Sequence, residues 1–285
     1  MSRSPSAFSL SAADTTLGGI VVGPEYGRLL LVVHGGPGES HDSLRPQLDA
    51  LASDERRVVY YDQRGGNRSP LAHGAAPGDW RSHVADLDAV RRHFVPGPVD
   101  ILGFSWGALL AVLYALGHRD DVARLVLVSP PPMHGASSDQ MRRDVAAACA
   151  RPEVRDVEAR ARQAASDATD PAARARAAFV ARIAAVLSDP ARAWDLTPSE
   201  VREDAARAVW SSLGAYDLRP RLPALRDLPI LIVGGVEDPV TASTIADTAS
   251  GLGARLALLD HCGHAPFCEA PEEFRRTVDG FLGSR

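Results

Sequence analysis

The stretch LGFSWGALLAVLYALG (residues 102–117) places Ser105 between Gly103 and Gly107. An apolar run, VDILGF, precedes the serine, and a helix-like apolar run, ALLAVLYAL, follows it. A GxSxG motif between a strand and a helix is typical of a nucleophile elbow, a strained turn that lifts a serine hydroxyl above a sheet. An ordinary tight turn is the alternative. We favour a nucleophile because both flanking contexts that the motif demands are present.

Continuous apolar runs recur along the chain, and each has the pattern of a strand buried on both faces. They cover residues 28–36, 56–66, 99–105, 123–130, 228–235 and 254–260. Amphipathic helical segments lie between them, such as 79–94, with Asp79 placed to cap it, and 270–283. Residues 5–23 alternate weakly and predict an antiparallel strand pair. Strands alternating with helices predict an α/β fold with a mostly parallel, doubly wound sheet.

The alternation stops in the middle of the chain, where an Ala- and Arg-rich stretch reads as helices only. At about 80 residues, this stretch is too long for an ordinary loop. We therefore expect a core formed by residues 1–132 and 215–285, interrupted by an all-helical cap of residues 133–214.

Two helices of the cap can be placed from local signals. Residues 170–189 open with Asp-Pro and carry apolar side chains on one side. Residues 197–214 open with a capping box from Thr197 to Glu200, with Pro198 as the first helical residue.

Composition excludes several classes of function. The formal net charge of −5 gives no electrostatic reason to bind nucleic acid or an anionic membrane surface. All 31 basic residues are arginine, which excludes a lysine Schiff base or lysine general base. Neither a signal-peptide stretch nor an apolar run long enough to span a membrane occurs.

The three cysteines, Cys149, Cys262 and Cys268, lack metal-ligand spacing. Free thiols in a cytoplasmic protein are the plain interpretation. We expect a cytoplasmic protein without a metal site.

A serine nucleophile needs a histidine base and a carboxylate to orient that base. His264 lies in the loop after the last predicted strand, where its imidazole could reach Ser105. His261 is the local rival, and we expect it to fill structural space. Five other histidines are expected to be solvated: His73, His83, His93, His118 and His134.

Asp238 follows the strand 228–235 and is the preferred acid, because Pro239 fixes the turn directly after it. Glu237 is the alternative acid. A structural role for Asp238, as the N-cap of the following helix, is the competing interpretation.

Acyl transfer places negative charge on oxygen, so oriented N–H donors are required. The backbone N–H of Trp106 and that of Gly36, in the turn HGGPG (34–38), are the expected donors. In YDQRGGNRS (61–69), we expect Asp62 and Arg64 to pair and brace the loop.

Together these motifs resemble the α/β-hydrolase superfamily, and within it the proline iminopeptidase (prolyl aminopeptidase) family. The matching segments are HGGPG, GFSWG, GHAPFCEAP and DQRGGNRS, in which Asn67 replaces the family's second glycine. The resemblance implies an α/β-hydrolase fold, a Ser105–Asp238–His264 triad, an acyl-enzyme intermediate and no cofactor.

The resemblance is weakest in the cap. Proline iminopeptidases hold the free amine of the substrate with cap carboxylates, one of them in a Trp-rich segment resembling WxxWE. The nearest stretch here is ARAWDLTPSE (191–200), which has a single Trp. The candidate amine-binding residues are Asp195, Glu200, Glu203 and Asp204.

The leading hypothesis is a serine hydrolase of the proline iminopeptidase type, which acts on small peptides or amides. An esterase, lactonase or thioesterase on the same scaffold is the close alternative, because a fold does not fix a substrate. A non-catalytic receptor with this fold is disfavoured by the complete set of motifs. The expected partner is a small-molecule or short-peptide substrate.

Overall fold

The computed structural model describes residues 5–12, 14–72, 75–199 and 201–283. Its centre is an eight-stranded sheet with the strand order β1-β2-β4-β3-β5-β6-β7-β8. The strands are β1 (Ser6–Ala12), β2 (Thr15–Val22), β3 (Arg28–Val33), β4 (Arg56–Tyr61), β5 (Val99–Phe104), β6 (Val122–Val128), β7 (Ile230–Gly235) and β8 (Arg255–Leu259). Only the pairs β1–β2 and β2–β4 are antiparallel, and the other five neighbouring pairs are parallel.

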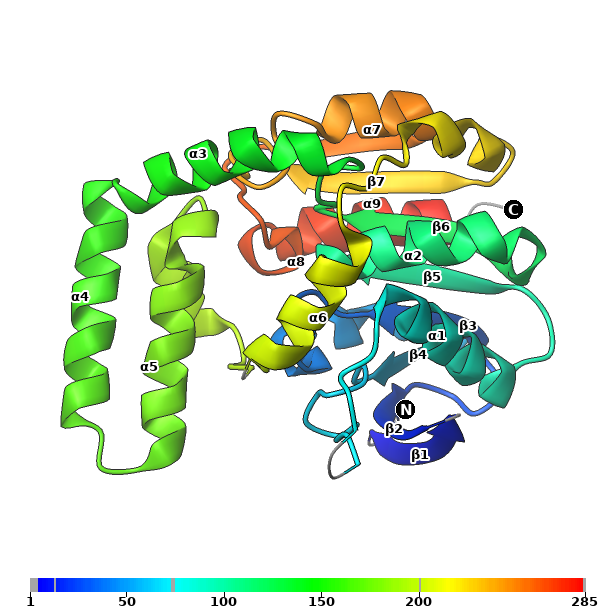
Figure 1. Cartoon of the computed structure of the whole chain (residues 1–285), viewed down its shortest axis with the longest axis horizontal. Helices are drawn as coiled ribbons and strands as arrows, with labels where there is room; N and C mark the ends of the chain where they lie inside the picture. Colours follow the sequence, from blue (N-terminus) through cyan, green and yellow to red (C-terminus); the bar gives the residue numbers. More distant parts are fainter. Residues whose placement is uncertain (1–4, 13, 73–74, 200, 284–285) are drawn as a thin grey trace.

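Helices cover both faces of this sheet (Figure 1). They are α1 (Trp80–Phe94), α2 (Trp106–Gly117), α7 (Ile245–Leu252), α8 (Pro266–Glu269) and α9 (Pro271–Gly283). Asp79 caps α1 as predicted, since its carboxylate accepts a hydrogen bond of 2.9 Å from the Ser82 amide. The predicted α/β fold with a doubly wound sheet is confirmed.

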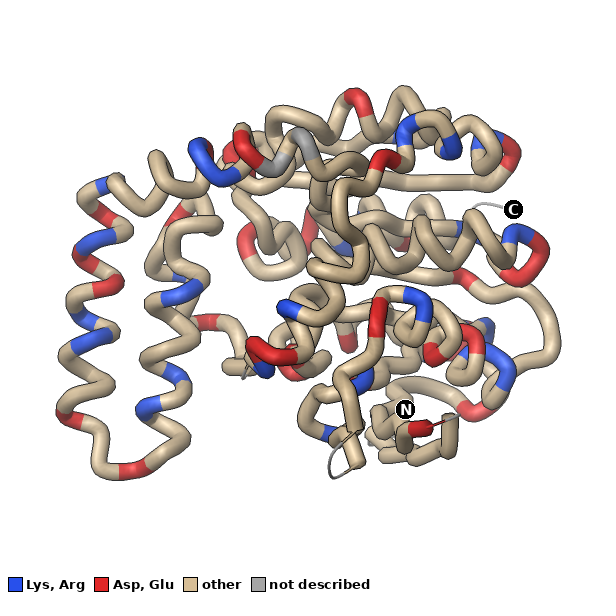
Figure 2. Tube along the Cα trace, viewed as in Figure 1, with Lys and Arg blue, Asp and Glu red and all other residues tan. Residues whose placement is uncertain are grey.

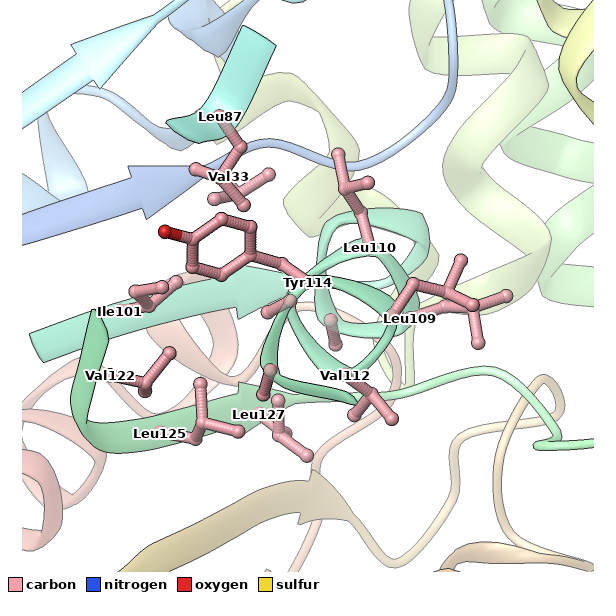
Figure 3. Packing of buried hydrophobic residues seen from close by; sticks show 14 of the residues in the cluster. Val33, Leu87, Ile101, Leu109, Leu110, Val112, Tyr114, Val122, Leu125 and Leu127 are labelled. Carbon is pink, nitrogen blue, oxygen red and sulfur yellow. The ribbon is translucent and has the colours of Figure 1, made fainter. Parts of the chain in front are cut away.

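The central strands are buried on both faces, which explains why their sequences read as unbroken apolar runs. In β3, Leu31 and Val33 point into the layer under α1 and α2, whereas Leu30 and Val32 point into the opposite layer, with α9. Figure 3 shows how side chains of α2 pack against Val33, Ile101 and Leu127 of three adjacent strands in the first layer.

The stretch between β6 and β7 is helical throughout its regular part, so the fold contains the predicted inserted cap. Its helices are α3 (Ser138–Cys149), α4 (Pro152–Asp167), α5 (Pro171–Ile183) and α6 (Glu203–Leu213). In Figure 1, α4 and α5 lie side by side at one end of the molecule, and α6 lies between them and the sheet. The exact limits assigned to the cap, residues 133 and 214, stay a prediction.

The two ends of this insertion meet in a short neck. The Leu218 amide donates to the Met133 carbonyl at 2.8 Å, and the Gly135 amide donates to the Tyr216 carbonyl at 2.8 Å. His134 and Asp217 between them form an antiparallel bridge. The chain therefore leaves the core and returns to it at nearly the same point.

The capping box expected at Thr197 is wrong, because α6 begins only at Glu203. The Thr197 hydroxyl donates instead to the Arg45 carbonyl at 2.6 Å, and the Ser199 hydroxyl donates to the Glu39 carboxylate at 3.2 Å. These bonds tie the segment before α6 to loops of the core. Glu200, the other half of the expected box, lies outside the described residues.

Within the described ranges, no helix combines the length and the apolar character needed to cross a membrane.

Candidate active site

Ser105 lies at the junction between β5 and α2 in a strained backbone conformation, with φ 52° and ψ −122°. Positive φ is uncommon for a residue that is not glycine. A Cβ on Gly103 would lie 2.3 Å from the Gly107 carbonyl oxygen, and a Cβ on Gly107 would lie 2.2 Å from the Val33 carbonyl oxygen. The two glycines are therefore required by the close approach of strand and helix around the serine.

Three side chains that are distant in sequence form one hydrogen-bonded relay. His264 Nε2 lies 3.0 Å from Ser105 Oγ, and His264 Nδ1 lies 2.9 Å from Asp238 Oδ2. Because an ionised carboxylate only accepts hydrogen bonds, Nδ1 carries the proton and Nε2 is free to accept the Ser105 hydroxyl proton. This is the arrangement of a general base next to a nucleophile.

Asp238 is fully buried, and other groups hold both of its oxygens. Oδ1 accepts from the Val240 amide at 2.8 Å, and Oδ2 accepts from the Thr241 hydroxyl at 2.8 Å. The competing helix-cap interpretation is wrong, because α7 begins at Ile245, several residues later. Glu237, the alternative acid, instead accepts from the Ser188 hydroxyl at 2.6 Å.

The loop that carries His264 is held by a residue that sequence reasoning missed, Glu269. Its carboxylate accepts from the amides of Gly263 and Ala265 at 3.1 Å each, and from the Ser188 amide of the cap at 2.7 Å. Burial raises the pKa of Glu269, although these amide bonds act in the opposite direction. The Glu of the segment GHAPFCEAP was the available signal for this role.

Two expectations about other histidines are wrong. The His261 side chain is 95% exposed rather than filling structural space, and its Nδ1 lies 3.7 Å from Glu237 Oε1. His83 is fully buried rather than solvated, because it packs edge-on against Trp106 and its Nδ1 lies 3.1 Å from Gln63 Oε1. Burial, assisted by the charge of Arg64, lowers the pKa of His83 to about 3. His73 lies outside the described residues.

The turn with the expected oxyanion donors lies directly against the nucleophile. A Cβ on Gly35 would lie 3.2 Å from Ser105 Cβ, and Gly36 has a φ of 46°, which favours glycine. Trp106 is the first residue of α2, where a backbone N–H has no acceptor within the helix. Gly36 and Trp106 line the same cavity as Ser105. Their role as donors stays a prediction.

The expected Asp62–Arg64 pair does not form. Asp62 accepts from the His41 amide at 3.0 Å and from the Arg68 amide at 2.7 Å. Burial acts to raise the pKa of Asp62, but the bonds and charge of His41 outweigh it and hold that pKa well below its usual value. Arg64 binds both carboxylate oxygens of Asp86 at 2.7 Å. Each residue braces the loop, but with a different partner.

A cavity of about 950 Å³ opens above Ser105 and His264, between the core and the cap. Most of its wall is apolar and includes Phe104, Phe179, Ile183, Leu187, Trp210 and Phe267. Three charged side chains join this wall, Glu39, Arg142 and Arg182. Arg182 Nη1 lies 2.5 Å from Glu39 Oε1, so the positive charge of Arg182 compensates the negative charge of Glu39.

Three of the expected amine-binding residues of the cap, Asp195, Glu203 and Asp204, do not line this cavity. Asp195 pairs with Arg192 at 2.6 Å, and Asp204 pairs with Arg202 at 3.0 Å. Glu203 is exposed in the first turn of α6, the helix that instead turns Ala205 and Val209 inward. The structure brings the three residues of the predicted triad together and leaves these three acids exposed. Glu200 lies outside the described residues.

One group of side chains elsewhere, Asp88, His118 and Asp121, could reach a common metal ion. The Arg91 guanidinium already lies 2.9 Å from Asp88 and 3.2 Å from Asp121. Arg92 Nε lies 3.1 Å from the other oxygen of Asp88, so two arginines already balance the two carboxylates of this group.

Comparison with known proteins identifies a matching family and similar curated sequences. The family model described as the alpha/beta hydrolase fold matches residues 28–271. A curated proline iminopeptidase of Clostridium botulinum is 27% identical over 268 residues, which are 89% of this chain and 89% of that protein.

Solved structures resemble the whole chain in fold. A proline iminopeptidase-related protein from Thermus thermophilus superposes with a TM-score of 0.76 at 22% identity, covering 99% of this chain and 98% of its own. The proline iminopeptidase of Mycobacterium smegmatis superposes with a TM-score of 0.71 at 24% identity, covering 98% of both chains.

Proposed function

The chain belongs to the α/β-hydrolase fold family, and on that premise we propose that it is a serine hydrolase that works through an acyl-enzyme intermediate. The observation that carries the proposal is the relay from Ser105 Oγ to His264 at 3.0 Å and from His264 to Asp238 at 2.9 Å. A protein that only binds a ligand has no need of such a relay.

In the first half of the reaction, Ser105 Oγ attacks the substrate carbonyl carbon while His264 Nε2 takes the hydroxyl proton. The carbonyl oxygen becomes negative and receives hydrogen bonds from the N–H groups of Gly36 and Trp106. When the tetrahedral intermediate collapses, the bond to the leaving group breaks, and His264 gives that group its proton. The acyl group stays esterified to Ser105.

In the second half, His264 removes a proton from water, and the resulting hydroxide attacks the acyl carbon. The ester bond to Ser105 breaks, the serine oxygen regains the proton from His264, and the carboxylic acid leaves. Asp238 stays ionised throughout and stabilises the imidazolium that forms twice in the cycle.

The lining of the cavity supports a substrate with an apolar acyl group, as in an ester, lactone or thioester. Its wall is mostly hydrophobic. Glu39 is the one acidic side chain among the described lining residues, and its charge is compensated by Arg182. A free substrate amine would therefore find little net negative charge in this cavity.

Removal of an N-terminal residue from a small peptide or amide is the second candidate. The names of the similar proteins favour it, and so does the position of Glu39. A Cβ on Gly36 would lie 2.5 Å from Glu39 Cδ, so this carboxylate lies beside the expected oxyanion turn. A substrate ammonium group that displaced Arg182 would lie close to the scissile carbonyl.

A fluorophosphonate probe tests the proposal, because it reacts only with an activated serine. We expect wild-type protein to be labelled and Ser105→Ala to remain unlabelled. Wild-type protein that stays unlabelled would argue strongly against catalysis.

Substrate class is then tested with p-nitrophenyl butyrate, prolyl-naphthylamide and N-acetyl-prolyl-naphthylamide. Preference for the ester, with no advantage of the free amine over the acetylated one, supports the apolar acyl group. Preference for the free amine, lost in Glu39→Gln, supports the aminopeptidase instead.

A further inference from the structure

Gln63, the residue after Asp62 in the segment 61–69, has a buried side chain with only 1% exposure. It takes no part in the proposed proton transfers. We propose that Gln63 is a positioning residue, which holds the Gly36 turn and the Trp106 backbone at the separation that an oxyanion requires. This inference rests on the proposed function.

On one side, Gln63 binds the residue that opens the oxyanion turn. Its backbone amide donates to His34 Nε2 at 3.0 Å, and its side-chain Nε2 donates to the His34 carbonyl at 2.8 Å. Because His34 Nε2 accepts, the ring proton is on Nδ1, which donates to the Gly35 carbonyl at 2.7 Å. Side chain and backbone of His34 are thus both fixed, two residues before Gly36.

On the other side, Gln63 binds the residue after the nucleophile. Its Oε1 accepts from Trp106 Nε1 at 2.8 Å. The same oxygen faces His83 Nδ1 at 3.1 Å. An indole N–H only donates, which establishes which end of the Gln63 amide is oxygen. The Trp106 side chain is 1% exposed, so this bond anchors the residue that begins α2.

The requirement for glutamine follows from the two ends of its amide. The nitrogen end must donate to a carbonyl of one segment, and the oxygen end must accept from an indole of the other. Glutamate lacks the donor, and methionine lacks both functions at a similar length. Each replacement leaves buried polar partners unpaired.

Positioning matters because oxyanion donors act only within a narrow range, about 2.7–3.1 Å from the developing charge. Displacement by about 1 Å lowers the rate of an enzyme by about 100-fold. Gln63 bridges both segments that carry the expected donors without contacting Ser105, His264 or Asp238 in any hydrogen bond of the described residues. Its loss is therefore expected to affect the oxyanion rather than the base.

The test compares Gln63→Glu and Gln63→Met with Ser69→Ala. Ser69 is the matched control, because it lies in the same segment, is fully buried, and bonds to the Asp62 carbonyl at 2.6 Å and the Gly18 amide at 3.0 Å. Each folded variant is measured for kcat and KM on p-nitrophenyl butyrate, for Tm, and for the Kd of butylboronic acid, whose tetrahedral adduct mimics the intermediate.

We expect kcat to fall about 30-fold in both Gln63 variants, with KM within about twofold and the boronate Kd weakened in step with kcat. The acid limb of the pH profile, which reports His264, is expected to keep its midpoint. Ser69→Ala is expected to lower Tm while keeping kcat.

Unchanged kcat in a folded Gln63→Glu protein would overturn the inference, and so would a loss of kcat that Ser69→Ala shares. If Gln63→Met does not fold, Gln63→Glu decides alone, since it keeps the shape and the acceptor for Trp106. A wild-type protein that the fluorophosphonate probe does not label overturns the proposed function itself, and this inference with it. A labelled wild type with fully active Gln63 variants overturns only this inference.

Discussion

Polar side chains around Ser105 differ from those on the cap helices in burial and in the partners that they bind. Asp238 and Gln63 are buried and make several hydrogen bonds to segments distant in sequence. On the cap, charged residues mostly pair along their own helix, as Arg162 with Glu158 and Arg192 with Asp195. Figure 2 shows acidic and basic positions alternating along α4, whereas α5 carries basic positions only.

The difference is energetic as well as geometric. An exposed pair between residues three or four apart on a helix contributes only about 0.3–0.5 kcal/mol. A buried polar group deprived of its partner costs about 1–3 kcal/mol, and more if it is charged. Substitutions should therefore be severe around the triad and mild on the cap.

The largest expected effect comes from the relay itself. We expect Ser105→Ala to abolish measurable ester hydrolysis, and Asp238→Asn to lower kcat about 10⁴-fold, since the amide no longer selects the His264 tautomer with a proton on Nδ1. Steady-state kinetics on p-nitrophenyl butyrate measure both. A fall below tenfold in Asp238→Asn would mean that another group orients His264.

A large effect on stability is expected at the elbow, where a single methyl group has no room. Gly103→Ala places a Cβ 2.3 Å from a backbone oxygen. We expect the free energy of unfolding to fall by about 3 kcal/mol, measured by urea denaturation. Gly97→Ala is the control, because no atom lies within 4 Å of its Cβ position. Equal stability of the two variants would contradict the close packing of β5 and α2.

Acid sensitivity is expected from His83, whose pKa is lowered to about 3 by burial and by Arg64. Between pH 6.5 and 3, His83 is protonated in the unfolded chain but stays neutral in the folded protein. The free energy of unfolding therefore decreases as the pH is lowered through this range. Between pH 6 and pH 4, the free energy of unfolding of His83→Gln should fall by about 2 kcal/mol less than that of the wild type. His93→Gln, at an exposed position of the same helix, is the control. Denaturation curves at these two pH values decide, and equal slopes in all three proteins would refute a buried, neutral His83.

The smallest effects are expected from the exposed acids of the cap. Asp195→Ala and Glu203→Ala should change kcat/KM by less than twofold on any of the three substrates, and the free energy of unfolding by less than about 0.5 kcal/mol. A tenfold loss confined to the free-amine substrate would show that the cap closes further onto the cavity when substrate binds. It would also restore these acids as amine ligands.

Sequence alone predicts most of the core, because the conformation of each of its segments is determined mainly by residues within that segment. Gly103 and Gly107 mark the elbow, the apolar runs mark the buried strands, and the positions after β7 and β8 suggest Asp238 and His264. Each of these signals reflects a constraint within one short segment, which a single sequence records.

The rest depends on contacts between segments. His83 and Gln63 look like ordinary polar residues, and only the packing of α1 on the sheet makes one the buried partner of the other. The Thr197 hydroxyl donates to the Arg45 carbonyl rather than capping a helix, because the core loop that carries Arg45 lies beside it. Glu203 fits an amine-binding role in sequence, but the first turn of α6 faces water.

The neck at Met133 and Leu218 makes the cap an exchangeable module. Backbone hydrogen bonds of 2.8 Å join the two ends of the cap where they enter the core. The cap is therefore attached to the core at one place, as a long loop would be. A different helical segment with the same two ends could be inserted there without moving β6 or β7. To keep the relay in place, it would have to supply the Val186 carbonyl that accepts from the His264 amide and the Ser188 amide that donates to Glu269. Evolution, or a designer, could thus change what this molecule accepts by replacing one continuous stretch of its gene.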